Sequence, residues 1–365
     1  MSERLFEPVV LGGQVLPNRI ILPPLTRSRA NEDGTPTELM ARYYRQRASA
    51  GLVICEGTVV SPQGASYARV PGLYSREQVD AWRPVVAAAK SNGAAVYAQL
   101  WHVGRQAHSS VQPDGLPPFA PSAIPIVDWK YRSPHGRIPF ERPRELSIDG
   151  IAEIVDQFAR AARNARDAGF DGVELHAANG YLFDQFLNSG SNVRTDKYGG
   201  SVENRLRFIK EVLDAVGNAM PLNRVGIRLS PSSSWMDVTD PDKKSLYSAL
   251  VRDLNPRGLS YLHLVEPGIA GSLSVGSDPE AIPSADLAEL SDGPVIVTGG
   301  LSAETAAALV AEGVADLVGF GRLFIANPDL PHRFRHGSDL AGLRSAGLYS
   351  GAEAGYTDYP HILTP

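Results

Sequence analysis

The sequence alternates short β-branched runs with segments of helical periodicity, and this alternation constrains the fold more than any other feature. Eight such runs occur, at residues 19–22, 52–56, 95–100, 172–176, 225–229, 261–265, 295–298 and 317–320. The segments between them include amphipathic stretches that mostly end in Gly or Asn-Gly, at residues 76–93, 147–169, 203–217 and 302–313. A strand that alternates with a helix eight times predicts an α/β fold of the closed parallel (β/α)8, or TIM-barrel, type.

Two further segments modify the predicted barrel. Residues 5–18 indicate two short strands around Gly12-Gly13, and we expect them to form a β-hairpin that covers the N-terminal end of the barrel. The connection after the third strand, about residues 104–146, is rich in proline and much longer than the others. We expect an excursion from one domain spanning 1–365, since barrels of about 200 to over 400 residues form single units. The excursion either covers the active site as a lid or lies in solvent without catalytic contact.

Composition excludes several classes of function. The formal net charge of -5 offers no basic surface to nucleic acid, and no run of about 18 apolar residues could span a bilayer. Cys55 is the only cysteine and no HExxH motif occurs, which argues against an iron–sulfur or zinc site. Cys55 lies in an apolar run, so we expect a buried, inert thiol. With no signal-peptide pattern at its start, the chain is predicted to be cytoplasmic, metal-free and active on small molecules, as a monomer or homodimer.

Polar residues gather where the predicted strands end. Barrel enzymes build their active sites from the loops that follow the strands, so these residues are expected to meet in one mouth. They are Pro23–Arg27 after the first strand, then Glu56–Thr58, Gln99–His102, His176–Tyr181, Arg228, Thr298–Gly300 and Gly321–Arg322.

The last two of these loops indicate an anion site. Gly299-Gly300 precedes a helix predicted to start at Ser302, and Gly321-Arg322 follows the eighth strand. Backbone N–H groups, a helix dipole and a guanidinium can therefore converge on a phosphate. The alternative is that Gly-Gly only permits a tight turn. If the ligand is FMN, Arg228 suits its N1/O2 edge, Gln99 its pyrimidine ring and Thr26 its O4.

Four stretches resemble signature sequences of the Old Yellow Enzyme family. They are NRIILPPLTRSRA (18–30), VELHAANGYLFDQFLNSGSNVRTDKYGGSVENRLRF (173–208), FGRLFIANPDLP (320–331) and GAEAGYTDYP (351–360). The second is far more specific than a short motif, and together they run from one end of the chain to the other. The resemblance implies an FMN-dependent ene-reductase, or NADH:flavin oxidoreductase, with NADPH or NADH as electron donor.

The resemblance also implies roles for matched residues. The isoalloxazine ring of FMN is expected at Pro24, Leu25, Thr26, Gly57, Gln99, His176 and Arg228, and its phosphate at Gly300, Gly321 and Arg322. The pocket for substrate is expected at His176, Asn179, Tyr181, Trp101, Tyr67 and Tyr356.

In the implied mechanism, hydride passes from N5 of the reduced flavin to the β-carbon of an activated alkene. Such alkenes are α,β-unsaturated carbonyl compounds, maleimides and nitroalkenes. His176 and Asn179 then donate hydrogen bonds to the oxygen on which charge develops, and Tyr181 delivers a proton. The pair His176 and Asn179 resembles the His/Asn subgroup of the family.

Other functions fit parts of the pattern. The same scaffold could reduce nitrate esters or nitro compounds, or bind flavin without catalysis. A barrel lyase could instead grip a phosphorylated substrate at Gly300 and Arg322, but a Schiff-base aldolase needs a lysine at a strand end. All six lysines are predicted to lie in helices or loops. His102 and His263 are expected to be structural.

Overall fold

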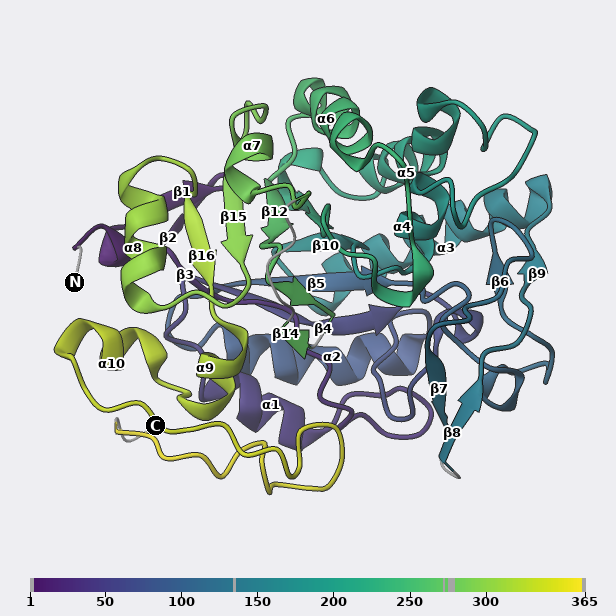
Figure 1. The fold of residues 1–365 in the computed structure, drawn as a ribbon. Helices are drawn as coiled ribbons and strands as arrows, with labels where there is room; N and C mark the ends of the chain where they lie inside the picture. The colour runs from purple at the N-terminus through teal and green to yellow at the C-terminus, as the bar shows by residue number, and fades with distance from the viewer. Residues whose placement is uncertain (1–2, 134–135, 272, 275–279, 363–365) are drawn as a thin grey trace.

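The computed structural model describes residues 3–133, 136–271, 273–274 and 280–362, and its centre is a closed barrel of parallel strands (Figure 1). In chain order these are β3 (Ile20–Leu22), β4 (Leu52–Val59), β5 (Ala95–Trp101), β10 (Gly172–Ala177), β11 (Val225–Leu229), β12 (Tyr261–Val265), β15 (Val295–Thr298) and β16 (Leu317–Gly319). Each strand pairs with its neighbour in the chain, and β16 pairs with β3 to close the barrel. The predicted (β/α)8 barrel is therefore confirmed.

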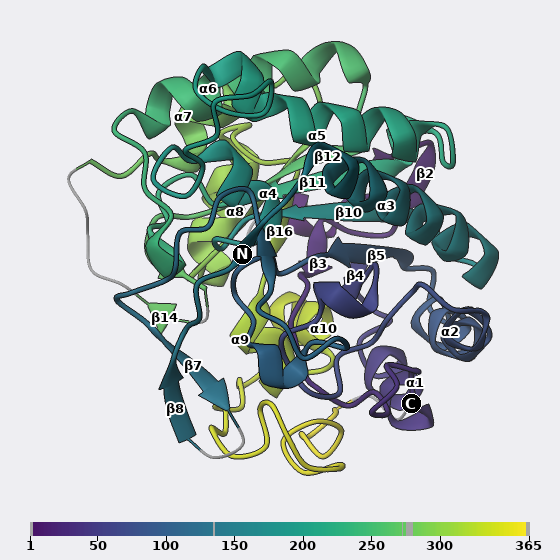
Figure 2. The same cartoon turned by 90° about the vertical axis from the view of Figure 1, so that its right-hand side faces the viewer.

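Helices surround the barrel, as the two ribbon views show (Figures 1 and 2). They are α1 (Glu38–Arg45), α2 (Arg76–Ala89), α3 (Ile148–Ala168), α4 (Leu182–Leu187), α5 (Val202–Gly217), α6 (Lys243–Leu254), α7 (Ser284–Ala288), α8 (Ala303–Ala311), α9 (Gly321–Ala326) and α10 (Leu330–His336). Short 3₁₀ turns lie at Glu3–Phe6, Pro62–Gly64, Ser109–Val111, Leu222–Arg224, Trp235–Asp237 and Asn255–Arg257.

The caps of α3 show how the sequence sets helix limits. The Ser147 hydroxyl accepts a hydrogen bond from the Gly150 N–H at 3.0 Å, which satisfies a backbone donor of the first turn. At the other end Gly169 adopts φ 95°, a left-handed conformation that glycine reaches at little cost. Helices α2 and α8 instead have their C-caps at Lys90 and Glu312, ahead of their predicted glycines.

The N-terminal hairpin closes one end of the barrel. Its strands β1 (Val9–Leu11) and β2 (Gln14–Leu16) pair antiparallel. Leu11 and Leu16 are buried in a cluster with inward-facing barrel residues at Ile21, Leu52, Ile54, Ala95, Tyr97, Tyr261, Ile296 and Leu317. Their burial removes apolar surface from water and plugs the N-terminal end, as predicted.

The excursion between β5 and α3 contains short strands and reaches the other loops of the mouth. Its strands are β6 (Phe119–Ala120), β7 (Lys130–Ser133), β8 (Gly136–Pro139) and β9 (Arg144–Glu145). The Tyr131 hydroxyl donates to the Ser66 carbonyl at 2.7 Å, in the loop after β4. The buried Arg105 guanidinium donates to the carbonyls of Met236 (3.1 Å) and Asp237 (2.8 Å), in the loop after β11. The excursion thus joins loops on two sides of the barrel.

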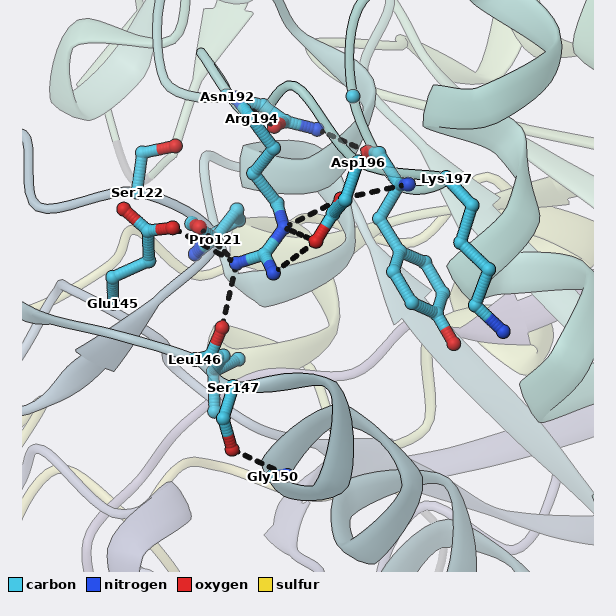
Figure 3. Close-up of polar contacts among 12 residues, drawn as sticks. Pro121, Ser122, Glu145, Leu146, Ser147, Gly150, Asn192, Arg194, Asp196 and Lys197 are labelled. Carbon is cyan, nitrogen blue, oxygen red and sulfur yellow. Dashed lines mark hydrogen bonds and ion pairs between the residues drawn. The ribbon is translucent and has the colours of Figure 1, made fainter.

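Arg194 ties the middle of the excursion to its C-terminal end (Figure 3). Its Nη1 donates to the Pro121 carbonyl at 2.7 Å and to the Leu146 carbonyl at 2.6 Å, while Asp196 pairs with the other side of the guanidinium. The side chain of Arg194 is only 4% exposed, so these bonds are shielded from water. The RTDKYGGS stretch, residues 194–201, therefore has a structural role, because it joins the middle of the excursion to the residues that lead into α3.

No helix in the described ranges is long and apolar enough to cross a membrane. Cys55 is fully buried, and burial raises the pKa of its thiol well above the usual range, which confirms the prediction of an inert thiol.

Candidate active site at the mouth of the barrel

Four of the predicted site residues form one aromatic group at the C-terminal end of the barrel. Trp101 ends β5, and its ring centroid lies 5.9 Å from that of Tyr67, 5.0 Å from Tyr181 and 6.2 Å from His176. The centroids of His176 and Tyr181 are 4.8 Å apart. Residues from the loops after β4, β5 and β10 therefore meet as the sequence predicted.

The turn of residues 178–181 carries Asn179 and Tyr181. Asn179 adopts φ 57° and Gly180 φ 72°, and a left-handed conformation is uncommon for a non-glycine residue. Hydrogen bonds from two sides hold Asn179 there: its N–H donates to the Ser230 hydroxyl at 2.7 Å, and its carbonyl accepts from Gln106 Nε2 at 2.8 Å. Because Gln106 belongs to the excursion, that segment contacts the backbone of a candidate catalytic residue. The excursion is therefore packed against this turn rather than free in solvent.

A buried carboxylate stabilises the same turn. Asp184 Oδ2 accepts from the Gly180 N–H at 2.7 Å, and its Oδ1 accepts from the Tyr247 hydroxyl at 2.6 Å. Burial raises the pKa of Asp184, although these hydrogen bonds oppose that effect. The sequence analysis missed Asp184 and Tyr247. An acidic residue inside the apolar run YLFDQF was the signal that could have identified Asp184.

Two ionisable side chains of the site, His176 and Tyr181, are held in their neutral forms. Burial, and then the charge of Arg228, lower the pKa of His176 well below its usual range. The imidazole therefore has one N–H to donate at physiological pH. Burial, and then the nearby phenol of Tyr67, raise the pKa of Tyr181 well above its usual range. Tyr181 consequently keeps its proton in neutral solution.

Several buried polar atoms here lack a hydrogen-bond partner among the residues that the structure describes. They are His176 Nδ1, Asn179 Oδ1, Arg228 Nε and Trp101 Nε1. Most buried polar atoms in proteins are paired, because an unpaired one loses its bonds to water without compensation. The mouth is therefore suited to a polar ligand.

A second feature of the mouth is a cavity of about 550 Å³ between the loops after β15 and β16, which we call the β15–β16 cleft. Gly300, Ser302, Gly321 and Arg322 are among the residues that line it. Gly300 adopts φ 70°, and Arg322 is exposed. The three residues predicted to bind a phosphate thus line one cavity, at the start of helix α8.

The remaining predicted cofactor residues follow β3 or lie in β4. Pro24 is buried, whereas Leu25 and Thr26 are partly exposed after β3. Gly57 lies at an irregularity in the pairing of β4 with β5. A Cβ at Gly57 would lie 2.7 Å from Cε3 of Trp101, so only glycine leaves room for the indole in this position.

Tyr356 lies apart from the aromatic group, which corrects the expectation that it lines the substrate pocket. It is fully buried, and its ring stacks on Tyr43 of α1 with centroids 4.2 Å apart. The Arg27 and Arg29 guanidinium groups lie over the same ring, and they donate to the carbonyls of Gly355 (2.7 Å) and Gly347 (2.6 Å). Tyr356 therefore packs the C-terminal segment onto α1 and the loop after β3.

A different tyrosine of this C-terminal segment reaches the site. Tyr349 is 48% exposed and lies close enough to Tyr67 and Tyr181 to raise the pKa of both phenols. Tyr349 comes just before residues 351–360, the last stretch that resembles the family. Nothing in the local sequence except the tyrosine itself indicated a place near the site.

The lysines do not support the aldolase alternative. The structure describes all six, and none lies on a barrel strand. Lys130 lies in strand β7 of the excursion rather than in a loop or helix, which corrects the prediction for that residue.

Comparison with known proteins agrees with this geometry. Residues 4–341 match the model of the NADH:flavin oxidoreductase / NADH oxidase family. A putative 12-oxophytodienoate reductase 2 from Oryza sativa subsp. japonica is 42% identical over 361 residues, which cover 98% of this chain and 94% of the relative.

Two solved structures show the same fold. Morphinone reductase in complex with tetrahydroNAD superposes with a TM-score of 0.92 at 44% identity, covering 99% of this chain and 98% of that one. The Old Yellow Enzyme homologue from Zymomonas mobilis superposes with a TM-score of 0.93 at 39% identity, covering 98% of this chain and 99% of that one.

Proposed function

Because this chain belongs to the NADH:flavin oxidoreductase / NADH oxidase family, and is thus an NAD(P)H-dependent Old Yellow Enzyme that uses FMN, we propose that it reduces activated carbon–carbon double bonds. The proposed substrates are α,β-unsaturated carbonyl compounds, maleimides and nitroalkenes. The names of the relatives support this class, because 12-oxophytodienoate and morphinone are both oxo compounds.

We place FMN across the mouth, with its ring system on the side of Gln99 and Arg228 and its phosphate in the β15–β16 cleft. The unpaired buried Nε of Arg228 and the exposed guanidinium of Arg322 support this orientation, since an anionic cofactor needs donors at both ends. Pro24, Leu25, Thr26 and Gly57 complete the proposed ring site, and Gly300 and Gly321 the phosphate site. Bound FMN supplies hydride that it has taken from NAD(P)H.

His176 and Asn179 stabilise the charge that develops on the substrate. The neutral His176 donates through its ring N–H and Asn179 through its side-chain amide, and both can bind one carbonyl or nitro oxygen. Donors fixed before the reaction stabilise the charged transition state more than the neutral ground state. The observation that carries the proposal is the left-handed backbone of Asn179, which is held from the loop after β11 and from the excursion.

Tyr181 supplies the proton. Its raised pKa keeps the phenol protonated at neutral pH, and its ring packs edge-on against both Trp101 and His176. These contacts fix the ring beside His176, so the hydroxyl can give its proton to the α-carbon, which carries part of the negative charge once hydride has been added to the β-carbon. Trp101 and Tyr67 form the adjoining wall of the proposed substrate pocket.

Separate half-reactions test this proposal. The protein is reduced anaerobically with NADPH, 2-cyclohexenone is added, and the flavin absorbance reports reoxidation. His176→Ala should slow reoxidation about 10²–10³-fold, because it removes one oxyanion donor, and should affect reduction by NADPH much less. His332→Ala, in helix α10, is the matched control and should leave both steps unchanged. A wild-type flavin that stays reduced after the enone is added, or equal slowing of both half-reactions, contradicts the proposal.

A further inference from the structure

A chain of buried hydrogen bonds lies inside the barrel next to the mouth. Gln99 Nε2 donates to Glu174 Oε1 at 2.8 Å, and Glu174 Oε2 lies 2.7 Å from His263 Nδ1. The other ring nitrogen of His263, Nε2, lies 3.1 Å from the Thr298 hydroxyl. Gln99 is 2% exposed, and Glu174 and His263 are fully buried. We call these four residues the Glu174 network.

The network crosses neighbouring strands in the order of the barrel. Its members come from β5, β10, β12 and β15, and Arg228 stands on β11 between them, opposite His263 in the register. Glu174 precedes His176 by two residues on β10, so both side chains point to the same side of the sheet. Glu174 therefore lies inside the barrel one layer below His176.

The carboxylate determines how the Gln99 amide is oriented. An ionised carboxylate only accepts hydrogen bonds, so Gln99 must turn its NH₂ group toward Glu174. The amide oxygen of Gln99 then points away from Glu174 and can accept an N–H from a ligand in the mouth. If the amide were flipped, two oxygens would face each other at hydrogen-bond distance.

The same carboxylate balances a cation. Burial lowers the pKa of His263, so its imidazole is neutral and donates its Nδ1 proton to Glu174 without cancelling the negative charge. Burial lowers the pKa of Arg228 too, and the charge of Glu174 acts in the opposite direction. A charge inside a barrel is costly unless an opposite charge lies near it, and Glu174 provides that charge for Arg228.

We propose that Glu174 is a positioning residue for the cofactor, which keeps the Gln99 amide oxygen toward the pyrimidine ring of FMN and offsets the charge of Arg228 beside that ring. This inference rests on the proposed placement of FMN at Gln99 and Arg228. Glu174 itself touches neither cofactor nor substrate and acts through these two residues.

The test uses Glu174→Gln and Glu174→Asp, with two measurements besides turnover. FMN affinity is measured by titrating the apoprotein and following flavin fluorescence, and the midpoint potential of the bound flavin is measured by redox titration. Glu174→Gln should weaken FMN binding about tenfold, because Gln99 loses its fixed orientation. It should also move the potential in the positive direction, since an unbalanced Arg228 favours the more negatively charged reduced flavin.

The second variant separates orientation from charge. Glu174→Asp keeps the negative charge but shortens the side chain, so FMN affinity should fall while the potential stays near the wild-type value. Glu153→Gln, which removes an exposed carboxylate of α3, is the control and should change neither quantity. If Glu174 had only a structural role, both variants would bind FMN more weakly, and the midpoint potential of the bound flavin would be the same in both.

Two outcomes overturn the inference and remain distinguishable from failure of the proposed function. If Glu174→Gln keeps wild-type affinity and potential while Gln99→Ala weakens FMN binding, the cofactor placement stands and the role of Glu174 fails. If Gln99→Ala and Arg228→Ala also leave FMN binding unchanged, the placement itself is wrong. Should Glu174→Gln not fold, wild-type FMN affinity in Glu174→Asp would still overturn the inference.

Discussion

The substrate side and the phosphate side of the proposed cofactor site differ in how tightly their residues are held. On the substrate side, the turn of residues 178–181 is held by buried side chains from α4, α6, the excursion and the loop after β11. The β15–β16 cleft is an open cavity of about 550 Å³ whose lining includes four glycines and the exposed Arg322. Proton transfer and charge stabilisation require donors fixed to within a fraction of an ångström, and this demands a packed surrounding. A phosphate has several equivalent oxygens, so charge and backbone N–H groups suffice to hold it.

Glycines illustrate the same contrast. At Gly300 an added Cβ would meet only Ile269, at 3.9 Å, so there the left-handed backbone is what favours glycine. At Gly57 the backbone needs no glycine, but the Trp101 indole occupies the space of a Cβ. Glycine thus supplies backbone freedom on the phosphate side and room for packing on the substrate side.

On the phosphate side, the largest expected effect is the loss of FMN affinity. Arg322→Ala should weaken FMN binding about 10²-fold, because a charge-assisted hydrogen bond contributes about 1.5–3 kcal/mol. The apoprotein should keep its melting temperature, since Arg322 is exposed and its side chain bonds Ser274 at the surface. Fluorescence titration with FMN measures the affinity, and Arg45→Ala on the exposed face of α1 is the control. If FMN affinity is unchanged, the β15–β16 cleft does not hold the phosphate.

A smaller effect should appear at low pH on the substrate side. His102 is 2% exposed beside Trp101, and burial lowers its pKa to about 4. Its ordinary pKa is about 6.5, so the unfolded chain binds a proton first as the pH falls, and folding stability is lost below pH 6.5. At pH 5 this linkage costs about 2 kcal/mol.

His102→Asn removes that titration while it keeps an acceptor for the Gly104 N–H, which bonds His102 Nδ1 at 3.1 Å. The wild type should therefore lose about 2 kcal/mol more stability than His102→Asn between pH 7 and pH 5. Urea unfolding at the two pH values measures the difference. Other buried histidines contribute equally to the loss of stability of both proteins at low pH. If the wild type and His102→Asn lose the same stability between pH 7 and pH 5, His102 takes up its proton in the folded state as well.

The smallest expected effect concerns packing at Gly57. Gly57→Ala should displace the Trp101 indole toward Tyr181 and lower kcat/KM for 2-cyclohexenone about tenfold, since overpacking costs about 1–3 kcal/mol. In a Trp101→Leu background the added methyl has space, and the same substitution should have no further effect. Gly300→Ala is the matched change in the β15–β16 cleft and should alter FMN affinity rather than enone turnover. A loss of the same size in both backgrounds would mean that Gly57 acts through something other than Trp101.

Strand periodicity was the most reliable guide to the fold. The eight β-branched runs became the eight barrel strands, and Gly12-Gly13 became the turn of the plugging hairpin. These elements follow from local patterns, because a buried parallel strand needs a continuous apolar run and a tight turn needs glycine. The prolines of the excursion located it in the sequence. Its contacts through Arg105 and Gln106 could not be predicted, because they join residues far apart in the chain and no local sequence pattern indicates them.

By itself the sequence determined the barrel, the family resemblance and the polar residues that follow each strand, because these depend on periodicity and on the kind of residue at a strand end. Only the tertiary structure decided which side chains support them. It put Asp184 and Tyr247 behind the turn of residues 178–181, Glu174 behind Gln99, and Tyr349 rather than Tyr356 beside Tyr181. The physical reason is that a buried polar group must find a partner across the fold, and its partner is set by the three-dimensional course of the chain rather than by its neighbours in sequence.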